Sequence, residues 1–151
     1  MSPRSGRADR EAGQTLLLVL GYVVLAALLV TLVTDASRVF LAERALAAAA
    51  DGAAVAAASG VDEPGVYAGS GAGVLPLSAE GGRARVARYV SRAELPARFP
   101  GFAVTGVATD GQTATVGLAA QVPLPFTGRF LAAWSAGYPI SATASARAPL
   151  R

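Results

Sequence analysis

The stretch 15–34 of this 151-residue chain, TLLLVLGYVVLAALLVTLVT, contains no charged side chain. As an α-helix it would be about 30 Å long, which matches the hydrocarbon core of a lipid bilayer. A soluble fold could bury such a helix only by surrounding it on every side, and the rest of the chain is short and rich in Gly and Ala. The sequence therefore predicts a transmembrane helix at 15–34 in preference to a buried core helix.

The flanks of this stretch predict its orientation. Residues 1–14 form a short tail with Arg4, Arg7 and Arg10, whereas Arg38 and Arg44 follow the apolar stretch. Basic residues in short flanks favour the cytoplasmic side, so we expect a single-pass protein of the cell membrane with a cytoplasmic N-terminus and an exported C-terminal part. A cleaved secretory signal would have a shorter apolar region that ends in a small-x-small site. We therefore expect a retained anchor.

The helical pattern continues over 35–59 as an amphipathic segment. This segment lacks proline, and its apolar residues recur at helical spacing on one face. We predict that this face packs helices, because small side chains allow close approach, and its central members are Leu46, Ala50, Ala53 and Ala57. The pattern leaves two alternatives open, packing against copies or partner subunits, or an ordinary juxtamembrane helix.

Two charged residues lie at the start of this segment. Asp35 and Arg38 are three positions apart, so we expect them to pair on the helix surface. Residues 60–77 are dense in Gly and Pro and are predicted to form a linker. The remaining residues, 78–151, are expected to form one small exported domain.

This domain is predicted to begin with a helix from Ser78 that Pro96 ends. Four arginines line much of its surface. They form either a solvated face whose stems cover the edge of the core, which we favour, or a surface for anionic lipid or a polyanion. The four residues are Arg83, Arg85, Arg88 and Arg92.

Three strands are predicted after this helix. Residues 102–109 and 112–122 flank Asp110-Gly111, which is a strong hairpin signal, and 138–148 forms the third strand. Residues 126–134 between the last two strands are predicted to be a loop or a short helix. The fold class is therefore α+β, a long transmembrane and amphipathic helix followed by one helix and about three antiparallel strands. So small a sheet favours the amphipathic half of the first helix as a covering layer.

Composition argues against several classes of function. The chain has no Cys and no His, which removes the usual zinc ligands, the thiol nucleophile and the commonest general base. We expect no catalytic, cofactor-binding or metal site, and no enzymatic activity. The net charge of +3 comes from scattered arginines without a basic stripe, so we expect no nucleic-acid partner.

Several short motifs resemble those of the TadE/TadG-like proteins of tight-adherence (Flp) pilus systems, within the general plan of pilin-like proteins. The motifs follow one another along the chain: AGQT at 12–15, Asp35 with Arg38, AERAL at 42–46, the Ala-rich 47–58 with DGAA inside it, VPLP at 122–125 and ATASAR at 142–147. The resemblance implies a structural subunit or assembly factor of an adhesive pilus, in contact with membrane lipid, with other pilus or pseudopilin subunits and with the assembly machinery. The alternative is a membrane-anchored accessory subunit of another envelope or secretion complex.

The same resemblance suggests a processing site. Prepilins are cleaved after a glycine, which here implies cleavage between Gly13 and Gln14. Such proteins carry a glutamate as the fifth residue of the mature chain, but that position is Leu18 in this sequence. The sequence therefore leaves both a processed and an intact N-terminus open.

Overall fold

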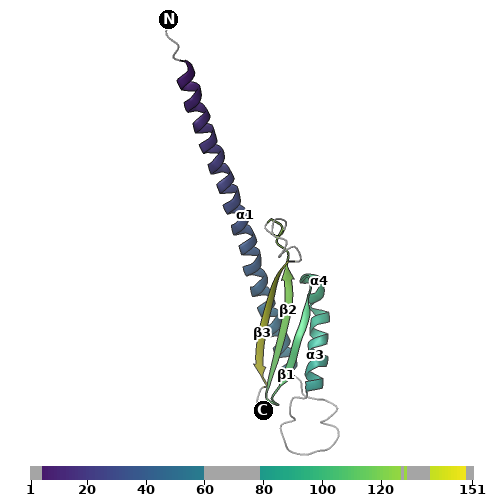
Figure 1. The fold of residues 1–151 in the computed structure, drawn as a ribbon. Coiled ribbons are helices and arrows are strands. Elements are labelled where there is room, and N and C mark those ends of the chain that lie inside the picture. The colour runs from purple at the N-terminus through teal and green to yellow at the C-terminus, as the bar shows by residue number, and fades with distance from the viewer. Residues whose placement is uncertain (1–4, 60–78, 127, 129–136, 149–151) are drawn as a thin grey trace, which may run out of the picture.

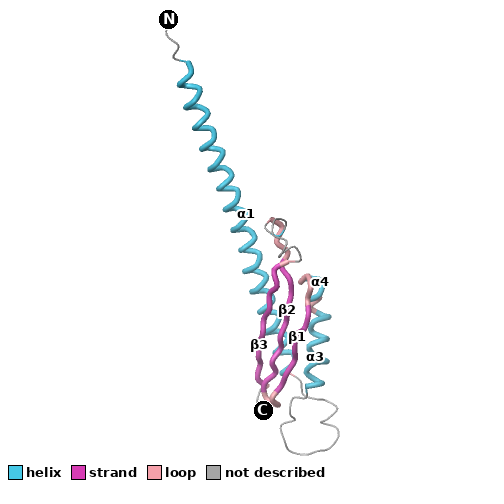
Figure 2. The backbone as a smooth tube through the Cα atoms, viewed as in Figure 1, coloured by secondary structure: helices cyan, strands magenta, loops and turns pink. Residues whose placement is uncertain are grey.

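A computed structural model of the chain describes residues 5–59, 79–126, 128 and 137–148. One long helix runs beside a three-stranded antiparallel sheet, and two shorter helices complete the fold (Figure 1). The elements are α1 (Ser5–Ala58), α3 (Ala79–Arg92), α4 (Leu95–Arg98), β1 (Ala103–Thr109), β2 (Thr113–Val122) and β3 (Tyr138–Arg147). The N-terminal half of α1 extends well beyond the sheet, and only the C-terminal half lies against it (Figure 2).

The long helix is continuous over 54 residues. It begins at Ser5, within the predicted tail and earlier than the predicted apolar stretch at 15–34, and it ends one residue before the predicted end at 59. The earlier start is understandable because the tail after Pro3 contains Ala, Arg and Glu, which are good helix formers, and no further proline.

The second predicted helix is interrupted. α3 ends at Arg92, before the proline that was expected to end it. Glu94 then adopts a left-handed backbone conformation with φ 50°, which stops the helix. Pro96 lies in the first turn of the short α4, where its missing N–H has no helical partner to lose. The prediction of one helix up to Pro96 is therefore wrong at its C-terminal end.

The sheet has the order β1-β2-β3, and both strand pairs are antiparallel. The predicted hairpin turn joins β1 to β2. One carboxylate oxygen of Asp110 accepts hydrogen bonds from the backbone N–H of Gln112 at 2.9 Å and of Thr113 at 2.6 Å. These bonds, chiefly the one from Thr113, lower the pKa of the Asp110 carboxyl. Gly111 supplies the positive φ of 91° that the turn requires.

The core lies between one face of the sheet and the two longer helices. α1 contacts β2 and β3, and α3 contacts β1 and α1. Alternate residues of β2 point into this core, and Val116 and Leu118 are fully buried. The opposite face carries small residues, among which the Thr115 and Ser145 hydroxyls share a hydrogen bond of 2.9 Å. This arrangement confirms the α+β fold that the sequence predicts, with α1 as a covering layer.

Two of the predicted segments cannot be compared with the fold in full. The linker at 60–77 lies outside the described residues. Most of the predicted loop or short helix at 126–134 does too.

Candidate functional site

The stretch of α1 from Leu16 to Val33 presents an apolar surface on all sides. From Leu16 to Val33, the large apolar side chains are between 51% and 71% exposed. Among the described residues, α1 is the one helix that is long and apolar enough to cross a membrane, and none of its most apolar window is buried within the chain. A surface of this size and composition requires a non-aqueous environment, either lipid or other apolar helices.

Three hydroxyl groups at the end of the apolar stretch are satisfied by the helix itself. The hydroxyls of Thr31, Thr34 and Ser37 donate hydrogen bonds to carbonyl oxygens three or four residues earlier, at 2.7–2.8 Å. Such bonds remove the cost of placing a hydroxyl in an apolar medium. The end of the apolar stretch is therefore compatible with hydrocarbon despite its threonines.

The predicted packing stripe lies on the other half of the helix. Leu46, Ala50, Ala53 and Ala57 are all 0% exposed. They belong to the core formed with the chain's own sheet and α3. The stripe therefore has no free surface for a copy or a partner subunit, and any contact between subunits must use other faces of α1. The physical reason is that a sheet of three strands needs a helix to cover it.

Gly52 brings α3 close to this half of α1. A Cβ atom at position 52 would overlap the hydroxyl of Tyr89 and lie 2.7 Å from its Cζ atom. Glycine is the one residue that leaves room for the aromatic ring at this spacing. The sequence pattern alone did not indicate this contact, since Gly52 reads as an ordinary interruption of an Ala-rich helix.

Asp35 lies in a different environment from the one predicted. Its side chain is only 3% exposed, whereas Arg38 is exposed. The expected surface pair is therefore wrong, because Asp35 is not on the surface. A helix cannot bury one of its own side chains to this degree, so another part of the chain covers this position.

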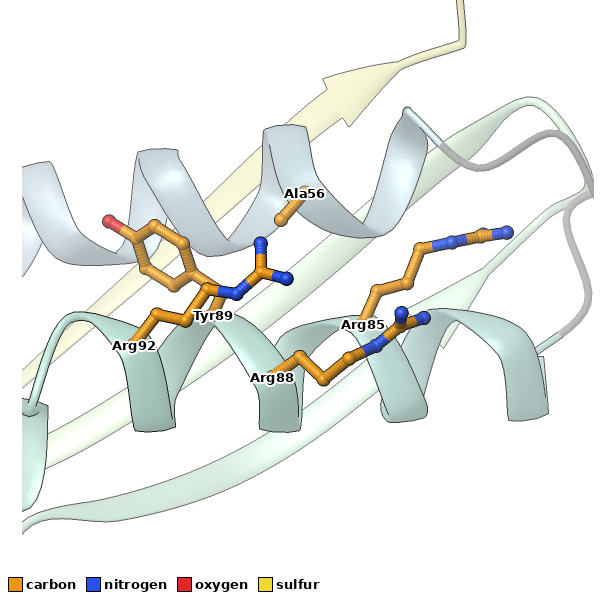
Figure 3. Close-up of a pocket in the computed structure, with 5 residues that line it drawn as sticks. All are labelled: Ala56, Arg85, Arg88, Tyr89 and Arg92. Carbon is orange, nitrogen blue, oxygen red and sulfur yellow. The ribbon is translucent and has the colours of Figure 1, made fainter.

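The arginines of α3 line a groove between α3 and α1. Arg85, Arg88 and Arg92 lie around Tyr89 beside Ala56, and the open volume is about 260 Å³ (Figure 3). Arg88 and Arg92 are exposed, as the solvated-face interpretation expects. Ala56 is about 30 Å along the helix from the end of the apolar stretch. A membrane that surrounds this stretch would therefore not reach the groove, which argues against the lipid alternative for these arginines.

The predicted cleavage site lies on the exposed surface of α1, and the predicted absence of a metal site can be compared with the described residues. Gly13 lies within α1, exposed and without neighbours near the position of a Cβ atom, and Gln14 follows it on the same helix. Within the described ranges, no group of three His, Cys, Asp or Glu side chains could hold a metal ion. The structure thus leaves the cleavage site and the absence of cofactors as predictions.

Comparison of the sequence with models of known protein families gives a match over the long helix α1. The model of the Tad family, Flp pilus-assembly TadE/G-like, matches residues 13–60. The match begins at the predicted cleavage glycine and confirms the resemblance that the N-terminal motifs indicated. It ends before the small domain, so it does not extend to the motifs at 122–125 and 142–147. Neither the curated proteins nor the solved structures include a match to the chain.

Proposed function

We propose that this chain is a membrane-anchored structural subunit or assembly factor of a Flp-type pilus. In this proposal the segment 15–34 spans the cell membrane, residues 1–14 are cytoplasmic, and the small domain is exported. The role is structural and not catalytic. Its partners are membrane lipid, other pilus or pseudopilin subunits and the assembly machinery, and no nucleic acid takes part.

One observation carries the proposal. The segment that matches the Flp pilus-assembly family, 13–60, covers nearly all of the described part of α1 from Gly13 onward. The first half of this segment is an apolar surface that the chain itself leaves uncovered. The second half is used internally to hold the small domain. A helix that anchors at one end and carries a folded domain at the other is what a subunit delivered through the membrane requires.

Deletion and complementation test the proposal. Deleting the gene should abolish or reduce pili on electron micrographs and weaken surface adhesion, and the wild-type gene should restore both. A Leu25→Arg variant should fail to restore them, because an arginine at the centre of a membrane helix costs about 2.5–3.5 kcal/mol of insertion free energy. The matched Leu25→Ala variant should restore them. Unchanged piliation in the deletion strain would refute the proposed role.

The N-terminal sequence of the mature protein distinguishes a filament subunit from a permanently anchored assembly factor. A protein recovered from native membranes that begins at Gln14 would have been cleaved as a prepilin, which supports a filament subunit. An intact start at Met1 or Ser2 would support a permanent anchor and an assembly role.

The alternative is an accessory subunit of another envelope or secretion complex. It predicts that proteins captured by crosslinking in native membranes are components of a secretion machine other than the pilus. Co-capture of a pilus platform protein and its ATPase would instead support the first proposal.

A further inference from the structure

We infer that the end of the small domain nearest the apolar stretch is a membrane-contact surface that lies in the phospholipid headgroup layer. Its described members are Phe40 and Leu41 on α1 and Phe126 and Tyr138 at the end of the sheet. We call these four residues the interfacial patch. The inference rests on the proposed membrane anchoring and adds to it a second, domain-borne contact with lipid.

The first support is the level that the domain reaches along α1. β2 runs toward the N-terminal side of α1, and its last residue, Val122, pairs with Tyr138 at the start of β3 (Figure 1). Asp35, which follows the apolar stretch directly, is already buried. Another part of the chain therefore already covers the helix where the apolar stretch ends. With 15–34 in the bilayer, this end of the domain must lie against the headgroups.

The second support is the distribution of exposed apolar side chains. Among the described residues after Thr34, the large hydrophobic residues that remain exposed gather mostly at this end. Phe40 is 54% exposed, Leu41 65%, Phe126 44% and Tyr138 37%. Val55 and Val104 are the exposed large hydrophobic residues outside the patch. Exposed apolar residues that cluster in this way mark a surface that contacts a membrane or another protein. Because aromatic residues are enriched at membrane interfaces, the two phenyl rings and Tyr138 favour a membrane.

The third support is continuity with the membrane-spanning surface. An open apolar groove is lined by Val33, Ala36, Ser37, Phe40 and Leu41, so it crosses the end of the apolar stretch without a break. Phe40 lies about 9 Å along the helix from Thr34, and the headgroup layer adds about 5–7 Å to each side of the hydrocarbon core. Helical side chains lean toward the N-terminus, which shortens the remaining distance.

The charges at this level fit a phospholipid surface. The guanidinium carbon of Arg44 lies 5.0 Å from the centre of the Phe40 ring, one turn farther from the apolar stretch. Arg38 is exposed on the same part of the helix. Basic side chains at the level of the headgroups attract anionic lipid, and the exposed Glu43 on the same part of the helix offsets part of that attraction. A second copy of the chain is the competing occupant of the patch.

The chain has no cysteine, so single-cysteine variants can carry a fluorescent label at a chosen position. We would label full-length Pro125→Cys, which leaves Phe126 in place, in vesicles of phosphatidylcholine and phosphatidylglycerol. Quenching is measured with lipids that carry a nitroxide near the headgroup. Gln112→Cys, in the exposed hairpin turn at the opposite end of the sheet, and Leu25→Cys, quenched by a nitroxide deep in the acyl chain, are the controls.

The inference expects loss of fluorescence at 125 and at 25, and none at 112. Quenching at 25 without quenching at 125 overturns the inference and leaves the membrane anchor intact. Absence of quenching at 25 overturns both. A label at 125 that is shielded from aqueous iodide but not quenched by lipid means that another protein copy covers the patch, which also overturns the inference.

A second pair of variants tests the named side chains. Phe126→Ser in the Pro125→Cys chain should reduce the lipid quenching at 125. Val55→Ser, which removes an apolar side chain outside the patch that is 56% exposed against 44% for Phe126, should leave it unchanged. Both residues are exposed, so neither change removes a core contact. Equal quenching in the two variants would overturn the role of Phe126.

Discussion

The contact between Gly52 and Tyr89 allows a test of how α1 holds the small domain. Replacing Gly52 with alanine adds one methyl group, which would lie 2.7 Å from Cζ of Tyr89 and overlap its hydroxyl. The tip of the ring must shift, and overpacking costs about 1–3 kcal/mol, with the lower end of that range applying where the ring can move into the open groove beside it. The same substitution favours the helix by about 0.8–1.0 kcal/mol, because glycine is a poor helix former.

These two effects separate when Tyr89 is removed. In the wild-type chain they oppose each other, and Gly52→Ala should lower the free energy of unfolding by up to about 2 kcal/mol. In a Tyr89→Ala chain the overlap is gone, so Gly52→Ala should raise the free energy of unfolding by about 1 kcal/mol. The sign of the effect inverts, and the coupling energy between the two positions should be about 1–3 kcal/mol.

Amide hydrogen exchange of β2 peptides, followed by mass spectrometry, measures the opening free energy of the domain in the full-length chain in detergent micelles. The wild type, the two single variants and the double variant are compared under the same conditions. Additive effects, within about 0.5 kcal/mol, would refute the reasoning and mean that the ring does not occupy the space beside Gly52.

Three further substitutions follow from the same core and hairpin. Gly82→Ala on α3 should stabilise the domain by about 1 kcal/mol in the same exchange experiment, because its Cβ would meet only Val107 Cγ1 at 3.8 Å; destabilisation would contradict this. Leu46→Ala should destabilise it by about 2–5 kcal/mol, since the side chain is 0% exposed, and a loss below 1 kcal/mol would mean that α1 is not docked. The pKa of Asp110 is lowered in the fold, so the contribution of its carboxylate to the free energy of unfolding is complete above the ordinary pKa of 3.8 and is lost as the pH falls through the lowered pKa. The thermal unfolding temperature of Asp110→Asn should therefore depend less on pH than that of the wild type in this acidic window. An equal pH dependence of the two proteins would contradict the assignment.

Much of the fold could be predicted because each element has a strong local signal. The hairpin at Asp110-Gly111 depends on two residues whose chemistry is specific to the turn, and β2 alternates strictly between buried and partly exposed positions. The break between α3 and α4 could not be predicted in the same way. Glu94 adopts a positive φ with no glycine to signal it, and Pro96 is as compatible with a helix start as with a helix end.

The functional surfaces were harder to predict, because their meaning depends on what lies opposite. The stripe from Leu46 to Ala57 has the pattern of a helix-packing face, and such a pattern does not say whether the partner is a second chain or the chain's own sheet. Asp35 looked like half of a surface pair because spacing alone places it beside Arg38. Its burial arises from tertiary contacts that no local pattern records.

The division of α1 into two halves limits how copies of this chain can associate. One face of the C-terminal half is covered by the sheet and α3, so contacts with another chain there are restricted to the exposed side, which includes Asp51 and Val55. The described side chains from 13 to 30 are all exposed and have no covered face within the chain. Association through 15–34 would therefore exchange lipid for protein without unfolding the domain, whereas association through the Leu46 stripe would first require the domain to open. Opening the domain requires its free energy of unfolding, so we expect copies of the chain to associate through the apolar stretch 15–34.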